Sequence, residues 1–331
     1  MFVNTVLNGL ADQMHRSGHL GTARSYRTTL RRLFSVLGDD IPESGIFSPE
    51  GILLYEKRLY ARGLAKSTIS FYMRTLRAMY NKGADNGSWP KQPHLFDNVY
   101  TGIQPTPKRA INPGILGQLQ ELDLSEKKKL AFTRDMFLLS YGLQGIAFAD
   151  LFSLRKCDLR GELLFYHRVK TGSPVLVAIS PFALEIIGRY AAQTQGSQYL
   201  LPLIENPDGD LYLQRCSALK TYNRHLEKLR VMLGVDDKLT SYVVRHTWAT
   251  TAQRVEIPIA LISQALGHQA EKVTHVYLSG FDQSALFEAN KKILIAAGLI
   301  TGCKTADKAV KREGEENVSR LRRERHFPMQ T

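Results

Sequence analysis

The chain has 331 residues, of which 44% are hydrophobic and 23% are charged, a balance typical of a globular protein with room for two domains. No apolar run approaches the roughly 20 residues that a membrane-spanning helix needs, and the first residues lack a basic leader followed by an apolar stretch. We therefore expect a cytoplasmic protein that has no membrane partner.

The formal net charge of +13 favours a polyanionic partner, with nucleic acid ahead of membrane surfaces, although many basic proteins bind neither. The three cysteines, Cys157, Cys216 and Cys303, are far apart and show no C-x-x-C spacing. This distribution argues against a disulfide framework or a zinc site.

The N-terminal part of the chain is predicted to form three or four basic amphipathic helices. Residues 1–20 are expected to hold one helix, the Ser48-Pro49 pair starts another that runs to about Arg62, and Ser67 is expected to cap a helix over residues 67–83. A further helix over residues 22–37 carries one apolar stripe, made of Tyr26, Leu30, Leu33, Phe34 and Leu37. Its other side carries Arg24, Arg27, Arg31 and Arg32, and taken alone these arginines are equally typical of a solvated surface.

Residues 101–114 contain three prolines, two glycines and a Lys-Arg pair, which is typical of an interdomain linker. A mostly helical second domain is expected after it. Residues 132–143 are apolar nearly all round and are predicted to lie in its core.

One clear β signal follows, in residues 161–179, where a strand ends at a Lys-Thr-Gly-Ser-Pro turn and a second strand returns. Strict alternation places Leu164, Tyr166, Arg168 and Lys170 on one face. A helix from about Cys216 to Leu233, ended by Gly234, is expected next.

Residues 240–277 are predicted to form two short helices. Ser241 or Thr240 is expected to cap the first helix, and Pro258 to start a second over residues 259–266. Gly267 can close the second helix, which places His268 just past its end. Tyr277 follows nine residues later.

Three short motifs in this stretch resemble the catalytic domain of the tyrosine recombinase, or phage integrase, family. They are R-H-T-x-A-T from Arg245, L-G-H ending at His268, and T-x-x-Y ending at Tyr277. The resemblance implies a mainly α fold with a small antiparallel β-hairpin or sheet. It also implies a helical core-binding (SAM-like) domain over residues 1–105, a catalytic domain over residues 106–300 and a basic tail over residues 301–331.

In this family a phosphodiester is broken by a side-chain nucleophile, with cations around the phosphate and a proton donor for the leaving 5′-hydroxyl. By resemblance, Tyr277 is the nucleophile that forms a 3′-phosphotyrosyl bond. Arg245 and His268 then hold the phosphate, and Lys170, at the hairpin turn, protonates the leaving hydroxyl. His246 is interpreted as a packing residue.

Two positions depart from the family pattern. Tyr242 stands where a histidine is usual, and Gln144 stands where the first arginine is usual, followed by the expected acidic residue, Asp150. Glutamine brings no charge, so one cation is missing. Arg168 is our candidate replacement, because it lies two residues before Lys170 on the same predicted strand face.

The resemblance also assigns partners. Arg24, Lys66, Arg74 and Arg77 are expected to contact DNA phosphates, and the helix over residues 284–300 either docks on a neighbouring protomer or is a plain core helix. We expect a homotetramer on double-stranded DNA that carries inverted or direct repeats, and an association with the nucleoid. No metal or nucleotide cofactor is expected, because no P-loop or carboxylate cluster is visible.

The expected activity is DNA inversion, integration or excision between short repeats. The chain resembles the compact members of the family without an arm-binding domain, similar to phase-variation DNA invertases. Two alternatives stay open: strand relaxation like that of a type IB topoisomerase, and a catalytically lapsed DNA-binding protein, given Gln144 and Tyr242.

Overall fold

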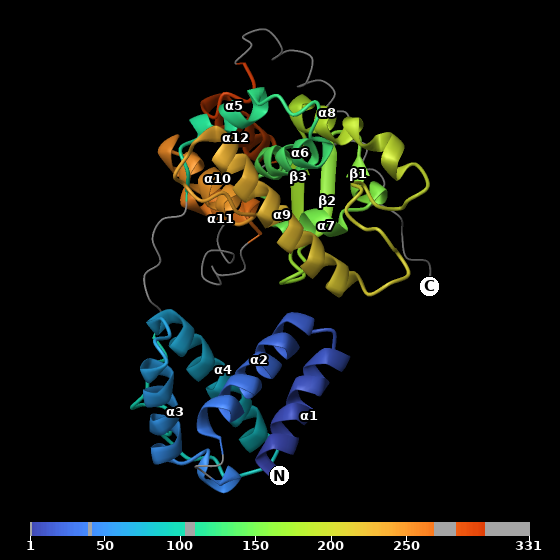
Figure 1. The fold of residues 1–331 in the computed structure, drawn as a ribbon. Coiled ribbons are helices and arrows are strands. Elements are labelled where there is room, and N and C mark those ends of the chain that lie inside the picture. Colours follow the sequence, from blue (N-terminus) through green and yellow to red (C-terminus); the bar gives the residue numbers. More distant parts are fainter. Residues whose placement is uncertain (1, 39–41, 103–109, 268–282, 302–331) are drawn as a thin grey trace, which may run out of the picture. The chain divides into compact units, whose positions relative to one another are not determined.

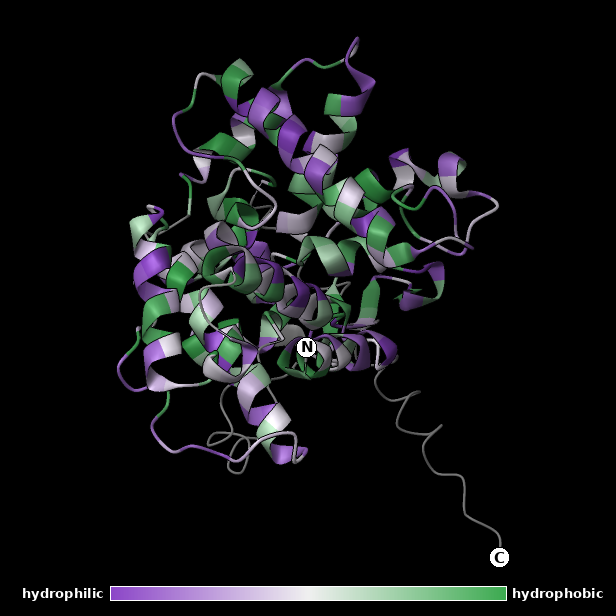
Figure 2. Cartoon of the chain, turned by 60° about the horizontal axis from the view of Figure 1, so that its bottom comes forward, coloured by the Kyte–Doolittle hydropathy of each residue, from purple (hydrophilic) through white to green (hydrophobic). Residues whose placement is uncertain are grey.

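The computed structural model describes residues 2–38, 42–102, 110–267 and 283–301, and the chain divides into two compact units, Met1–Pro107 and Lys108–Thr331 (Figure 1). Each unit is built around its own apolar core. Green and purple segments alternate along individual helices in Figure 2, as expected for amphipathic helices that bury one face. Within the described residues, no helix is long and apolar enough to cross a membrane.

The first unit is helical. Its elements are α1 (Phe2–Arg16), α2 (Leu20–Leu37), the 3₁₀ turn η1 (Glu43–Gly45), α3 (Pro49–Ala61) and α4 (Lys66–Asp85). The predicted stripe of α2 faces the core, although Phe34 is only half-buried. Helix α3 starts as predicted, with the Ser48 hydroxyl accepting the Gly51 N–H at 3.0 Å.

Helix α4 starts one residue earlier than predicted. The carbonyl of Ala65 accepts the N–H groups of Thr68 and Ile69, so Lys66 already lies in the helix and Ser67 is not its cap. The side chain of Ala65 makes no capping bond. The predicted serine cap was wrong because the backbone begins its helical bonding before that residue.

The second unit is mostly helical around a small sheet. Its elements are α5 (Gly114–Glu121), α6 (Lys128–Gly142), α7 (Phe148–Ser153), η2 (Lys156–Asp158), β1 (Leu159–Arg160), β2 (Leu163–His167), β3 (Pro174–Ala178), α8 (Pro181–Arg189), η3 (Ala191–Thr194), α9 (Leu211–Leu233), α10 (Val243–Arg254), α11 (Ile259–Ala265) and α12 (Gln283–Ala296). The described chain thus has the expected fold class, mainly α with a small antiparallel sheet.

The sheet has three antiparallel strands in the order β1-β2-β3, and Leu164 pairs with Val177 in its register. In Figure 1, β2 and β3 stand side by side, and α11 and α12 contact β3. The prediction of a two-stranded hairpin missed β1, because two residues are too short to show an alternation.

The predicted shared strand face of Arg168 and Lys170 was wrong. Strand β2 ends at His167, and a tight turn follows in which the Gly172 N–H donates to the Arg168 carbonyl at 2.8 Å. Beyond a turn the side chains no longer alternate. Arg168 is therefore buried, whereas Lys170 lies in the turn and is exposed.

Helix α6 is central to the second unit and contacts α8, α9 and α10. Residues 136–142 are all buried, as the all-round apolar pattern predicts. Helix α9 ends as predicted at Gly234, whose φ is 64°, but it starts earlier than predicted. The Asp210 carboxylate caps it by accepting the Leu213 N–H at 2.9 Å.

The predicted cap of α10 was also wrong. The helix begins at Val243, whose N–H donates to the Thr240 carbonyl, while the Ser241 N–H donates to Asn223 Oδ1 at 2.8 Å. Neither side chain caps the helix. Helix α11 ends as predicted, with Gly267 at a φ of +60° just past it.

Helix α12 packs in the core of its own unit, which is the plain alternative that the sequence left open. Leu286, Ile293 and Leu294 are buried there. Asn290 fixes the helix: its Oδ1 accepts the Trp248 indole N–H at 3.1 Å, and its Nδ2 donates to the Gly142 carbonyl at 2.9 Å. Its described exposed residues include Glu288, Lys292 and Ile295.

Candidate active site

Arg245 projects from α10 into the interior of the second unit. The core side chains of α10, Val244 and Trp248 among them, fix the helix against the rest of the unit. Arg245 is 7% exposed; its Nη1 donates to the Gly145 carbonyl at 3.0 Å and its Nη2 to the Leu266 carbonyl. The arginine therefore joins the loop before α7 to the end of α11.

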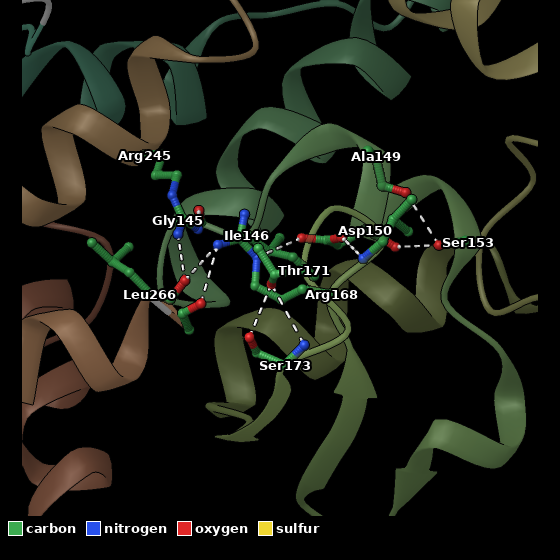
Figure 3. Close-up of polar contacts among 12 residues, drawn as sticks. Gly145, Ile146, Ala149, Asp150, Ser153, Arg168, Thr171, Ser173, Arg245 and Leu266 are labelled. Atoms are coloured by element: carbon green, nitrogen blue, oxygen red, sulfur yellow. Dashed lines mark hydrogen bonds and ion pairs between the residues drawn. The ribbon is translucent and has the colours of Figure 1, made fainter. Parts of the chain in front are cut away.

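Arg168 reaches the same place from the end of β2 (Figure 3). Its Nη1 donates to the carbonyls of Leu266 at 3.0 Å and Gly267 at 3.4 Å, and its Nε pairs with Asp150 Oδ2 at 3.3 Å. Arg168 is 9% exposed and Asp150 is 2% exposed. Two guanidiniums and one carboxylate are thus gathered around the backbone just before residue 268.

Gly267 leaves the room that this arrangement needs. A Cβ atom built at this position would lie 2.7 Å from Arg168 Cδ and 2.7 Å from Val175 Cγ2, which is far inside ordinary contact distance. The positive φ of Gly267 is also one that L side chains rarely adopt. Glycine in the L-G-H motif is therefore required both by the backbone and by Arg168.

Asp150 also holds the hairpin turn. Its Oδ1 accepts the Val169 N–H at 2.8 Å, while its Oδ2 accepts from Arg168. The turn is further closed by the hydroxyls of Thr171 and Ser173, which are 2.9 Å apart. Lys170 lies in this turn, exposed, and among the described residues no partner is found for its ammonium group.

Gln144 is buried, precedes the Gly145 that Arg245 contacts, and has an unusual backbone conformation. Its φ is +59°, which few non-glycine residues adopt, and it is 2% exposed. Neither Nε2 nor Oε1 has a hydrogen-bond partner within the described chain. The next carbonyl along the chain, that of Gly145, is the one that accepts from Arg245.

Tyr242 is the residue just before the N-terminus of α10 and is 53% exposed. Its ring stands edge-on to His246, with the ring centroids 4.6 Å apart. Tyr242 precedes Arg245 by three residues, so the two side chains project from neighbouring points of one helix face. No hydrogen bond of its hydroxyl to the arginine pair is present among the described residues.

Burial and like charge act together on Arg245. Burial, and after it the positive charge of Arg168, together lower the pKa of Arg245 to about 10. Arg245 still carries its charge at neutral pH, because this pKa lies well above 7. Burial also raises the pKa of the neighbouring Tyr166 phenol, which therefore stays protonated and is a poor nucleophile.

The predicted nucleophile and histidine, Tyr277 and His268, lie outside the described residues. The described chain reaches Gly267, next to both arginines, and resumes at Gln283. Within the described residues, no group of three or more His, Cys, Asp or Glu side chains could hold a metal ion.

The predicted DNA-contacting residues of the first unit are all exposed. Arg24 is on α2, whereas Lys66, Arg74 and Arg77 are on α4. The Lys66 ammonium lies 4.4 Å from the centre of the Tyr100 ring, and Arg77 Nη1 donates to Thr101 Oγ1 at 3.5 Å. Arg74 Nε donates to the Ser70 carbonyl at 3.4 Å.

The sequence did not indicate that the Leu266 carbonyl is a common acceptor for two arginines, because a backbone oxygen leaves no trace in residue type. It did mark Asp150 as the expected acidic position, but not its double contact with Arg168 and the hairpin turn. In the sequence, the signal for that contact was limited to an acidic residue, Asp150, placed 18 residues before an arginine near a predicted strand end, Arg168.

Comparison with known proteins agrees with this geometry. Residues 121–284 match the model of the phage integrase family. Tyrosine recombinase XerC of Mesorhizobium japonicum is 29% identical over 239 residues, which cover 70% of this chain and 70% of the relative. The protein is a tyrosine recombinase of the phage integrase family, and by class it is a DNA strand-transferring enzyme.

Solved structures show the same fold. A lambda integrase tetramer bound to a Holliday junction matches with a TM-score of 0.59 and 14% identity, covering 84% of this chain and 79% of that one. The Tn1549 transposon integrase in complex with transposon right end DNA matches with a TM-score of 0.57 and 15% identity, covering 96% of this chain and 100% of that one.

Proposed function

We propose that the protein is a site-specific recombinase that cuts and rejoins double-stranded DNA through a 3′-phosphotyrosyl bond to Tyr277. The observation that carries this proposal is the convergence of Arg168 and Arg245 on the backbone just before His268. Two buried guanidiniums form a site that suits a phosphate group.

The chemistry then follows from the groups around that site. The Tyr277 phenol gives up its proton to water beside the positive side chains, its oxygen attacks the phosphorus and the bond to the 5′-oxygen breaks, while Arg245 and His268 hold the non-bridging oxygens. Lys170, exposed at the hairpin turn, gives its proton to the leaving 5′-oxygen. The phosphotyrosyl ester keeps the energy of the broken bond, so another 5′-hydroxyl can reseal the strand without a nucleotide cofactor.

Binding of DNA is assigned to the exposed basic residues of the first unit. Lys66, Arg74 and Arg77 lie on α4 and Arg24 on α2, and such contacts position the duplex while carrying little sequence information. We extend this to a homotetramer on DNA with inverted or direct repeats; the similar lambda integrase forms a tetramer bound to a Holliday junction. Because α12 is packed in its own unit, a neighbour would contact its exposed residues, such as Ile295, unless the helix leaves its core. Acting on chromosomal DNA, the protein would work in the cytoplasm at the nucleoid.

We propose more specifically that the protein either inverts DNA between short repeats or integrates and excises it there. A plasmid carrying a pair of candidate repeats from the gene's own neighbourhood, in both orientations, separates the outcomes. Inverted repeats give an inverted segment, and direct repeats give a deleted circle. Relaxation of supercoils without exchange of flanking DNA would instead indicate a topoisomerase-like activity.

A nicked suicide substrate tests the core of the proposal. Cleavage next to the nick releases a short oligonucleotide, so the covalent protein–DNA adduct accumulates. We expect an adduct with the wild-type protein and none with Tyr277→Phe, while both bind the same DNA in a mobility-shift assay. DNA binding without any wild-type adduct would favour a lapsed, purely DNA-binding protein.

A further inference from the structure

We propose that Arg168 supplies the second guanidinium to the scissile phosphate, and that Gln144, at the position where the family pattern has an arginine, adds a neutral amide donor beside it. In the family pattern this positive charge comes from the loop before α7, whereas in this protein it comes from the end of β2. This inference rests on the proposed function and names two further groups that touch the reacting phosphate.

The first observation is the shared acceptor. Arg168 Nη1 and Arg245 Nη2 both donate to the Leu266 carbonyl, so the two guanidiniums lie within hydrogen-bond distance of the same oxygen. Arg245 is the arginine of the R-H-T motif. A phosphate held by Arg245 therefore lies within reach of Arg168. Both guanidiniums can then donate hydrogen bonds to its non-bridging oxygens, as both donate to the Leu266 carbonyl.

The second observation is donor capacity. Arg168 uses Nε for Asp150 and Nη1 for the carbonyls of Leu266 and Gly267. Its Nη2 makes no hydrogen bond within the described chain, and it is not among the fully buried unpartnered atoms. A guanidinium has five N–H donors, so Arg168 can bind a phosphate oxygen without giving up its link to Asp150.

The third observation is charge. Arg168 and Arg245 bring two positive charges into the buried cluster, and Asp150 returns one negative charge. Two like charges held this close together repel one another, and an anion placed between them relieves that repulsion. A phosphodiester carries one negative charge and is such an anion. The lowered pKa of Arg245, caused by burial and by the charge of Arg168, is consistent with this repulsion.

The fourth observation is the Gln144 amide. It is buried, both its polar atoms lack partners within the described chain, and its backbone has a φ of +59°. A buried polar group without a partner and a strained backbone both destabilise a fold, and they persist at sites where a ligand supplies the missing bond. The carbonyl of the next residue, Gly145, accepts from Arg245, so the Gln144 backbone is one residue away from a contact of that arginine.

The rival explanation is that Arg168 is only structural, because it is paired with the buried Asp150. The chain offers a matched control in Arg134. Its Nε pairs with the buried Asp135 at 2.9 Å and its Nη1 donates to the Leu122 carbonyl at 2.8 Å. Arg134 thus makes the same kinds of contact as Arg168, but to residues of α6 and its preceding loop.

The test compares an ordinary scissile phosphodiester with a methylphosphonate at the same position, in the nicked substrate and with the full chain. The methylphosphonate has no negative charge, so a cation that neutralises the phosphate contributes much less to its cleavage. For Arg168→Gln we expect adduct formation on the diester to fall by on the order of 10²–10³-fold relative to wild type. On the methylphosphonate the loss should be less than about 10-fold.

Arg245→Gln should show the same selective loss, and Arg134→Gln should change both substrates by the same factor. The inference is overturned if Arg168→Gln cleaves the diester like the wild type, or if it loses both substrates equally. Should Arg168→Gln not fold, as judged by thermal unfolding, Arg168→Lys replaces it, and an equal loss on both substrates again overturns the inference. Failure of the proposed function looks different, because the wild-type protein then forms no adduct with either substrate.

Discussion

Arg168 and Arg245 donate hydrogen bonds to one backbone oxygen, the carbonyl of Leu266, which lies 98 and 21 residues from them in the chain. The end of α11 is therefore the point at which β2 and α10 are held together. Both contacts lie within the last two described residues before position 268.

Gly267→Ala should damage both stability and cleavage. The new Cβ would lie 2.7 Å from Arg168 Cδ and from Val175 Cγ2, at a φ of +60°. The positive φ costs about 1–2 kcal/mol for an L residue, and overpacking adds about 1–3 kcal/mol. Thermal unfolding and the rate of adduct formation measure the two effects.

Gly234→Ala is the matched control for that change. Gly234 has a φ of +64° at the end of α9, and a Cβ atom there would meet nothing within 4 Å. This variant should show the backbone penalty alone and keep normal cleavage. Equal losses of stability in the two variants would contradict the idea that Arg168 needs the space at Gly267.

Gln144→Leu should make the protein more stable and less active. The substitution removes two buried polar atoms that lack partners within the described chain, and each such group costs about 1–3 kcal/mol. At the same time it removes a donor from the phosphate site, which should slow adduct formation by on the order of 10²-fold. Chemical denaturation and the suicide substrate give the two readouts. A variant that is both less stable and fully active would show that the Gln144 amide has a structural partner.

The sequence predicted those parts of the fold that depend on local patterns. The buried stripe of α2, the Ser48 cap, the all-round apolar α6 and the glycine ends of α9 and α11 each follow from residues within one or two helical turns. The predicted caps at Ser67 and Ser241 failed because neither helix begins at a capping side chain. Helix α4 starts at the Ala65 carbonyl, and Ser241 is engaged through its N–H by Asn223, a contact that local sequence does not show.

The site was predictable only in part. The motif spacing singled out Arg245. The period of a strand pointed to Arg168, although the strand face that it assumed for Arg168 and Lys170 was wrong. The strand ends before Arg168, and the residue is brought to Arg245 by Asp150 and by the carbonyls after α11. Such long-range backbone contacts have no local signature, so only the fold could show them.

His225 should make stability depend on pH. Burial lowers the pKa of His225 below its ordinary 6.5, and the charges of Arg224, Lys228 and Lys129 lower it further. The unfolded chain then binds the proton more readily than the folded one, so the free energy of unfolding falls as the pH is lowered through 6.5. Denaturation midpoints measured from pH 8 to pH 5, at intervals of about one pH unit, give this fall in the free energy of unfolding. His225→Gln should flatten it, and an unchanged slope would assign the effect to other groups.

Lys170→Ala should slow cleavage by removing the proton for the leaving 5′-oxygen. The ammonium is exposed in the hairpin turn, which Asp150 holds through the Val169 N–H, so the loop can present it to bound DNA. Loss of a general acid typically costs on the order of 10²–10⁴-fold in rate. A substrate with sulfur in place of the bridging 5′-oxygen needs no such proton, because a thiolate leaves readily. Lys170→Ala should therefore recover to near the wild-type rate on the sulfur substrate, whereas Arg245→Gln should stay slow. If neither variant recovers, Lys170 acts on the phosphate charge or on DNA binding, and the proton must come from another group.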